Sequence, residues 1–223
     1  DAACRCKSTS DGSDDNDNQT RGDFPELKVL VDGTEETLYV VYDETWSQAT
    51  TDSNSLAYDY NNRMYLSTVN AVDPYKLYKP NLLGGSISFT VDLSKSGCGC
   101  VSALYAILMP AEDNYNDPFK YCDANQVGGH FCPEFDIMEA NKYAFRSTGH
   151  KCDQPNAAGI YDNCDRGGQC HFDVLEDMSA MDFGPGPLYK INTENPFNVG
   201  QYFEEDNGVF TGYSTIISQG TNQ

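Results

Sequence analysis

Short segments in which apolar and polar residues alternate recur along the chain from Glu26 onward, and turn dipeptides separate them. Asp32-Gly33 follows one such segment and Asn207-Gly208 interrupts another, which predicts two hairpins. The alternating segments are 28–31, 38–42, 86–93 and 202–213, and the nearly all-apolar segment 103–109 is expected to be a central strand. No long apolar stripe with helical spacing appears. The pattern predicts an all-β fold, a sandwich of antiparallel sheets.

The ends of this pattern suggest how the chain is organised. Residues 1–24 are rich in Asp, Asn and Ser and carry almost nothing apolar, so we expect a flexible acidic arm. Residues 25–223 are expected to form one β-sandwich domain. The region 143–187, rich in Gly, Pro, Asn and Cys, is expected to be long loops stapled by disulfides.

The charge balance narrows the classes of partner. The 223 residues include 34 Asp plus Glu against 14 Lys plus Arg, a formal net charge of −20 with a pI near 4.2. Repulsion from phosphates argues against binding nucleic acid or an anionic membrane. No segment approaches the ~20 apolar residues of a membrane span. The start at Asp1, without a charged and apolar leader, is typical of a processed, soluble chain.

Nine cysteines indicate an oxidising, extracellular compartment. Because the count is odd, at least one is unpaired or bonds to another polypeptide. A zinc site built from Cys98-Gly-Cys100 with His130 or His150 is the competing interpretation, but the spacing does not match common zinc motifs. We expect no metal and no cofactor.

The segment 132–141 contains the candidate catalytic residues, three clustered carboxylates. Glu134 and Asp136 share one face of a regular strand, whereas Glu139 points to the other, and a single bulge would return all three to one side. Clustered carboxylates raise the pKa of at least one member. Retaining glycoside hydrolysis needs this arrangement, with one protonated and one ionised carboxyl group about 5 to 5.5 Å apart. An exposed acidic strand edge and a calcium site remain as alternatives.

The same segment resembles a known signature. Glu134-Phe-Asp-Ile-Met-Glu139-Ala-Asn resembles the E-x-D-x-x-E-A-N motif of glycoside hydrolase family 7, the cellobiohydrolases and endoglucanases. The shorter E-x-D-x-x-E is shared with laminarinase-like members of family 16 in the same clan, and the neighbouring motifs favour family 7. Those motifs are Val40-Val-Tyr-Asp43-Glu-Thr-Trp46, Arg63-Met-Tyr-Leu66, Phe89-Thr-Val-Asp92-Leu-Ser94, His150-Lys-Cys152, Arg166-Gly-Gly-Gln-Cys170 and Phe183-Gly-Pro-Gly186.

The resemblance runs from about Leu38 to about Phe203 and implies a concanavalin-like jelly roll. It implies Glu134 as nucleophile, Glu139 as general acid/base and Asp136 as the assisting carboxylate. The other implied residues are the substrate-contacting His150, Tyr105 and Asp123, with disulfides Cys122–Cys132 and Cys152–Cys170.

Departures from the family pattern shape the functional hypothesis. The family domain is much longer, so the chain is expected to be a short or truncated version that another polypeptide could complete. Trp46 is the single tryptophan, and Gln48 stands where the family has a tunnel-entrance Trp. Both features favour an open cleft over a tunnel.

These observations predict a secreted, retaining endo-β-glucanase that cleaves β-1,4-glucan. One alternative is a β-1,3 or mixed-linkage glucanase, or a transglycosylase. Another is a non-catalytic matrix or cell-wall protein that keeps the glucanase fold for binding glycans.

Overall fold

The computed structural model describes residues 23–43, 49–111 and 116–221, which form two compact units. Within these residues, the first unit comprises 80–108 and 122–221, and the second comprises the described residues up to 79 together with 109–111 and 116–121. The acidic arm, up to residue 22, and both Trp46 and Gln48 lie outside the described residues. No helix in the described part is long and apolar enough to cross a membrane.

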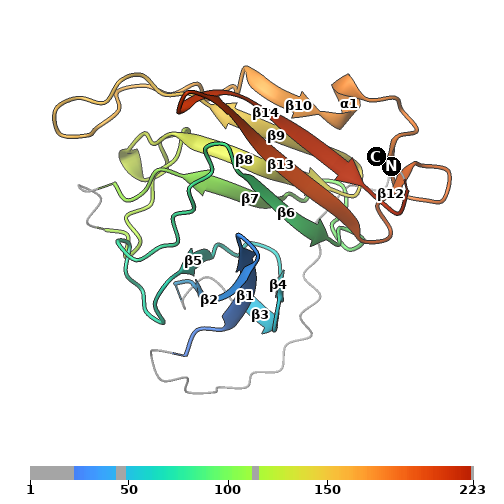
Figure 1. Ribbon diagram of the computed structural model, residues 1–223, viewed down its shortest axis with the longest axis horizontal. Coiled ribbons are helices and arrows are strands. Elements are labelled where there is room, and N and C mark those ends of the chain that lie inside the picture. Colours follow the sequence, from blue (N-terminus) through green and yellow to red (C-terminus); the bar gives the residue numbers. More distant parts are fainter. Residues whose placement is uncertain (1–22, 44–48, 112–115, 222–223) are drawn as a thin grey trace. The chain divides into compact units, whose positions relative to one another are not determined.

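The first unit is built from two antiparallel sheets that Figure 1 shows as stacked layers. The four-stranded sheet has the order β10-β9-β8-β7, and the three-stranded sheet has the order β14-β13-β6. The strands of the first sheet are β7 (Ser102–Ile107), β8 (Glu134–Asn141), β9 (Ala144–His150) and β10 (Cys170–Asp173). Those of the second sheet are β6 (Ser86–Val91), β13 (Phe197–Asp206) and β14 (Val209–Ser218). The all-β prediction is therefore confirmed.

The hydrophobic core of this unit lies between the two sheets. Met138 and Ala140 of β8 and Phe145 of β9 belong to the same buried cluster as Val199 of β13 and Ile217 of β14. Each of these five side chains is less than 10% exposed. Since side chains alternate along a strand, the residues between them on β8 and β9 point to the outer face of the four-stranded sheet.

Short elements complete the first unit. They are η1 (Val127–Gly129), α1 (Val174–Asp177), β11 (Phe183–Gly184) and β12 (Ile191–Asn192), of which β11 and β12 pair in parallel. The Asp173 side chain accepts a hydrogen bond from Leu175 N and so begins the single turn of α1.

The second unit contains β1 (Glu26–Val31), β2 (Thr34–Val41) and β5 (Tyr65–Ser67) in one sheet. A hairpin of β3 (Ala49–Asp52) and β4 (Ser55–Tyr58) accompanies this sheet. Its small core contains Leu27, Val40 and Ala49.

Both predicted hairpins are present. Asp32 and Gly33 have φ of 50° and 76°, and Asn207 and Gly208 have φ of 53° and 79°. Positive φ at both central positions is the type I′ geometry that matches strand twist, and it explains the choice of Asp-Gly and Asn-Gly. The expectation of a central strand at 103–109 was wrong, because β7 ends the four-stranded sheet and its residues are half-buried.

The described disulfides confirm one pairing and correct the other. Cys122 bonds to Cys132 as expected. Cys152 bonds to Cys164, not to Cys170, and Cys170 is an exposed free thiol. The physical reason is local: Cys152 and Cys164 face each other in an isolated β-bridge that closes the 152–164 loop, whereas Cys170 pairs with Gly149 as the first residue of β10.

Candidate active site

The hairpin of β8 and β9 sets the register of the site. Asn141 Oδ1 accepts hydrogen bonds from the backbone N–H groups of Tyr143 and Ala144, which fixes a tight turn after β8. Asn141 then lies opposite Ala144, and Glu139 lies opposite Arg146. Directly opposed residues of antiparallel strands point to the same face, so Glu139 and Arg146 share the outer face of the sheet.

A bulge in β8 brings the three acids together. The pairing of β8 with β9 shifts between Asp136 and Glu139, so that Asp136 lies opposite Thr148 and Glu134 opposite His150. The pairing with β7 shifts at the same place. The extra residue moves Glu139 to the face that Glu134 and Asp136 already occupy, as the odd spacing predicted.

A buried polar network that involves both sheets lies beside this bulge. Ser147 Oγ lies 3.0 Å from the carbonyl oxygen of Asp136 and 3.1 Å from Gln201 Oε1. Gln201 also accepts from Thr215 Oγ1 at 2.9 Å and donates to Ser214 O at 3.2 Å. Ser147 and Gln201 are fully buried. Ser147 of β9 thus connects Gln201 of the second sheet to the backbone of β8 beside the bulge.

The acids open into one polar cavity of about 190 Å³. The cavity is lined by Asn125, Glu134, Asp136, Glu139, Arg146, Thr148, His150, Arg166 and Gly167. A larger hollow of about 610 Å³ follows the Cys152–Cys164 loop and shares Arg166 with the cavity. We assign the candidate active site to the smaller cavity, because it holds the clustered carboxylates.

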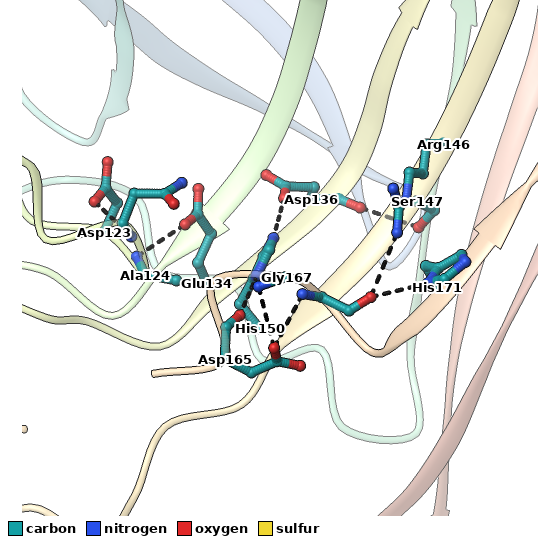
Figure 2. A network of polar contacts seen from close by, with 12 residues as sticks. Asp123, Ala124, Glu134, Asp136, Arg146, Ser147, His150, Asp165, Gly167 and His171 are labelled. Carbon is teal, nitrogen blue, oxygen red and sulfur yellow. Dashed lines mark hydrogen bonds and ion pairs between the residues drawn. The ribbon is translucent and has the colours of Figure 1, made fainter. Parts of the chain in front are cut away.

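Glu134, one of the residues that line this cavity, is held by the backbone of Ala124 (Figure 2). Its Oε2 accepts a hydrogen bond of 2.9 Å from the backbone N–H of Ala124, on the loop closed by the Cys122–Cys132 disulfide. Burial raises the pKa of Glu134 to about 7, against the opposing effect of the Ala124 hydrogen bond, and the charge of Asp136 adds to the rise. Glu134 therefore exchanges its proton near neutral pH.

Asp136 and His150 form the central ion pair. Asp136 Oδ2 lies 2.9 Å from His150 Nε2, and both side chains are over 90% buried. His150 Nδ1 lies 2.6 Å from the carbonyl oxygen of Asp165. Both ring nitrogens thus face acceptors, and the hydrogen bond to Asp136 raises the pKa of His150 to about 9 although burial opposes it. The ring is a cation at neutral pH.

This pairing bears on the predicted roles of both residues. Asp136 Oδ2 is engaged by the His150 ring. The His150 nitrogens are already engaged by protein acceptors, so a hydrogen bond from this ring to a sugar hydroxyl would have to replace one of them. In this arrangement, His150 orients the central carboxylate.

Glu139 is half-buried on the same face. Burial raises the pKa of Glu139, and the charge of Asp136 raises it further, whereas His150 and Arg146 lower it. Glu134 and Glu139 are therefore two carboxyl groups on either side of an ion pair, both disposed to hold protons at higher pH than ordinary glutamates.

The other two predicted contacts lie outside the cavity lining. Tyr105 faces Asp136 across β7 and β8, on the same face, but is not among the lining residues. Asp123 is 5% exposed and its Oδ1 accepts from the backbone N–H groups of Asn125 and Val127. Asp123 thus shapes the loop that presents Ala124, and it adds to the negative field at Glu134.

Sequence reasoning missed Arg146, Thr148 and Arg166 as lining residues. Arg146 and Thr148 could have been found from the turn that follows Asn141. With the strand pairing counted outward from this turn, Arg146 lies opposite Glu139, and one bulge in β8 then places Thr148 opposite Asp136. Arg166 had only the motif resemblance to mark it. Among the described residues, no group of three His, Cys, Asp or Glu has the arrangement of a metal site.

No protein-family model matches the chain, but curated proteins do. The endo-beta-1,4-glucanase celB of Emericella nidulans is 29% identical over 196 residues, covering 70% of this chain and 45% of the relative. Endoglucanase 1 of Humicola insolens is 32% identical over 155 residues, covering 55% of this chain and 37% of the relative. The chain thus spans less than half the length of these curated relatives.

Solved structures share the fold. An endoglucanase I complexed with cellobiose matches with a TM-score of 0.71 at 22% identity, over 91% of this chain and 72% of the other. The native endocellulase EGI of Humicola insolens matches with 0.72 at 21% identity, over 90% and 72%. A family 7 cellobiohydrolase from Daphnia pulex matches with 0.62 at 20% identity, over 90% and 71%. The chain is therefore related in sequence to endoglucanases, and its β-sandwich is that of the glycoside hydrolase family 7 cellulases, as its motifs predicted.

Proposed function

We propose that this chain provides the catalytic site of a secreted endo-β-1,4-glucanase that acts with retention of configuration in an open cleft. The observation that carries the proposal is the cavity in which a β-bulge gathers Glu134, Asp136 and Glu139 on one face. The endoglucanase relatives and the cellobiose complex among the similar folds support a β-1,4-glucan substrate. The Cys122–Cys132 and Cys152–Cys164 disulfides support an oxidising, extracellular compartment.

The reaction would proceed in two displacements. Glu134, ionised, attacks the anomeric carbon while Glu139 gives its proton to the glycosidic oxygen, so the bond to the leaving sugar breaks as the glycosyl–enzyme ester forms. Glu139, now ionised, takes a proton from water, and this water displaces Glu134. Asp136 lies between them, paired with His150, and its negative charge disfavours ionisation of both glutamates at once.

The pKa of Glu134 predicts the pH dependence. Because the nucleophile must be ionised and its pKa is raised to about 7, kcat/KM should rise as the pH passes through about 7. Burial and the charge of Asp136 raise the pKa of Glu139, and activity should fall once this acid loses its proton. The two requirements together give a bell-shaped profile that belongs to the coupled pair.

Two experiments test the proposal. Glu134→Gln should lower turnover of soluble β-1,4-glucan roughly 10³-fold or more, whereas the same change at the exposed Glu194 should leave it unaltered. A cellobioside activated at C1 and fluorinated at C2 should trap an ester on Glu134, visible by mass spectrometry of the peptide. Normal turnover by Glu134→Gln would refute the assignment of Glu134 as nucleophile. Cleavage restricted to β-1,3-linked glucans would refute β-1,4-glucan as the substrate.

A further inference from the structure

Two buried polar atoms in the candidate site have no hydrogen-bond partner. Among the described residues, they are Arg146 Nε and Thr148 Oγ1. Both residues line the cavity of the three acids, and Thr148 is 2% exposed. Buried polar groups are nearly always paired, so two orphaned atoms that are neighbours on one strand face indicate a place where a ligand completes the hydrogen bonding.

Arg146 is not occupied by an ion pair. It lies opposite Glu139 across β8 and β9, yet the hydrogen bond its guanidinium makes is a long one, 3.5 Å from Nη2 to Gly168 O. Asp173 lies opposite Arg146 on β10, but its carboxylate accepts from Leu175 N at the start of α1. The planar fork of the guanidinium is therefore available to a ligand in the cavity.

The charges around the cavity favour an anion at this position. Three cations line it, Arg146, Arg166 and His150, although the chain has a net charge of −20 and five arginines in all. His150 is paired with Asp136, and Arg166 donates to Gln126 Oε1 at 2.9 Å and lies over the Phe131 ring.

With Glu139 protonated to act as the acid, Glu134 and Asp136 are the remaining carboxylates of the three acids, and Asp136 is paired with His150. Arg146 then has no anion of its own. The Asp165 carboxylate nearby accepts from the backbone N–H groups of Gly167, Gly168 and Gln169, so it is committed to its own turn.

We propose that Arg146 and Thr148 bind an oxyanion substituent on a sugar that flanks the cleaved bond, so that the preferred substrate is an acidic β-glucan. A guanidinium makes two parallel hydrogen bonds to a carboxylate or sulfate, and the Thr148 hydroxyl can donate a third. A uronic acid carboxylate and a sulfate ester both have this chemistry. The position opposite Glu139 places the group beside the bond being broken. This inference rests on the proposed function and names its substrate class.

The test compares matched oligosaccharides. Cellopentaose would be assayed beside the same oligosaccharide bearing C6 carboxylates or 6-O-sulfates, with wild type, Arg146→Gln and Arg146→Lys. Wild type should favour one of the acidic substrates, and Arg146→Gln should reduce the ratio of its kcat/KM to that of cellopentaose by roughly 10- to 100-fold. Arg146→Lys should retain part of the preference. Lys151→Gln removes one positive charge at an exposed position, as Arg146→Gln does in the cavity, and should leave the substrate preference intact.

Binding separates this inference from the proposed function. In the Glu134→Gln background, titration calorimetry should show that the acidic oligosaccharide binds more tightly than cellopentaose, and adding Arg146→Gln should abolish this difference in affinity. If wild type cleaves nothing but this difference is present, the hydrolase proposal fails and the anion site stands. Equal binding of both oligosaccharides, or a preference that survives Arg146→Gln, overturns the anion site. The melting temperature of Arg146→Gln should not fall, since the change removes a partly buried cation whose Nε has no hydrogen-bond partner, whereas a structural role would lower it.

Discussion

Glu134→Gln should make the protein more stable as well as inactive, and the gain should depend on pH. The unfolded chain releases the Glu134 proton near 4.5, whereas the folded protein holds it until about 7, chiefly because the side chain is buried. Between these values the folded state binds more protons than the unfolded state, so wild type loses stability as the pH rises. Gln has no proton to lose and can still accept the hydrogen bond from Ala124 N.

The size of the effect follows from the same shift. A rise of the pKa from 4.5 to about 7 sets an upper limit of about 3 kcal/mol. Because the side chain is only half-buried, solvent screening reduces this to about 1 to 2 kcal/mol. For a chain of this length, that corresponds to a melting temperature about 2 to 8 °C above wild type at pH 8, and the difference should be small at pH 5.

Differential scanning calorimetry from pH 5 to pH 8 measures this directly. The exposed Glu194→Gln is the matched control, with the same chemical change outside the cavity. A stability difference for Glu134→Gln that stays constant across this range, or a variant less stable than wild type at pH 8, would show that burial does not raise the cost of ionising this carboxyl group.

Three other changes probe the surroundings of the acids. Asp136→Asn should lower the pKa of His150 from about 9 toward 6.5, which NMR titration measures. In wild type, the raised pKa of His150 stabilises the fold fully below pH 6.5, and this stabilisation is lost as the pH rises through about 9. In Asp136→Asn this pH-dependent stabilisation should be absent. Gln201→Leu should lower the free energy of unfolding by about 1 to 3 kcal/mol, because it leaves buried polar groups unpaired. Asn198→Ala, at an exposed amide on the same strand, should lower it by less than about 1 kcal/mol. Equal decreases for the two variants in denaturant unfolding would contradict the role of the buried network. Cys122→Ser should lower the stability by about 2 to 3 kcal/mol, and an unchanged melting temperature would argue against the disulfide.

Local sequence rules predicted the features that depend on local chemistry. Asp32-Gly33 and Asn207-Gly208 specify type I′ turns because both positions require positive φ. The odd spacing of Glu139 from Asp136 required a bulge if the three acids were to share a face, and the bulge lies between them. These features depend on neighbours in the chain, so the sequence alone contains them.

Features that depend on distant segments were not predicted. The pairing of Cys152 with Cys164 depends on how the 152–164 loop folds back, and motif likeness pointed to Cys170 instead. The hydrogen bond between His150 and Asp136 required the register of β8 against β9, which neither residue reveals alone. An apolar run such as 103–109 does not say whether its strand is central or at the end of a sheet.

The two faces of strand β9 contact different parts of the first unit. Arg146 and His150 belong to the cavity, while Phe145 and Ser147 pack toward the other sheet. Deleting one residue from the Lys142–Tyr143 turn would exchange these sets, placing a phenyl ring in the cavity and a guanidinium in the core. Burial of an apolar interior therefore also preserves the orientation of the face that carries the three acids, so variants that fold well will mostly retain the alignment of these acids.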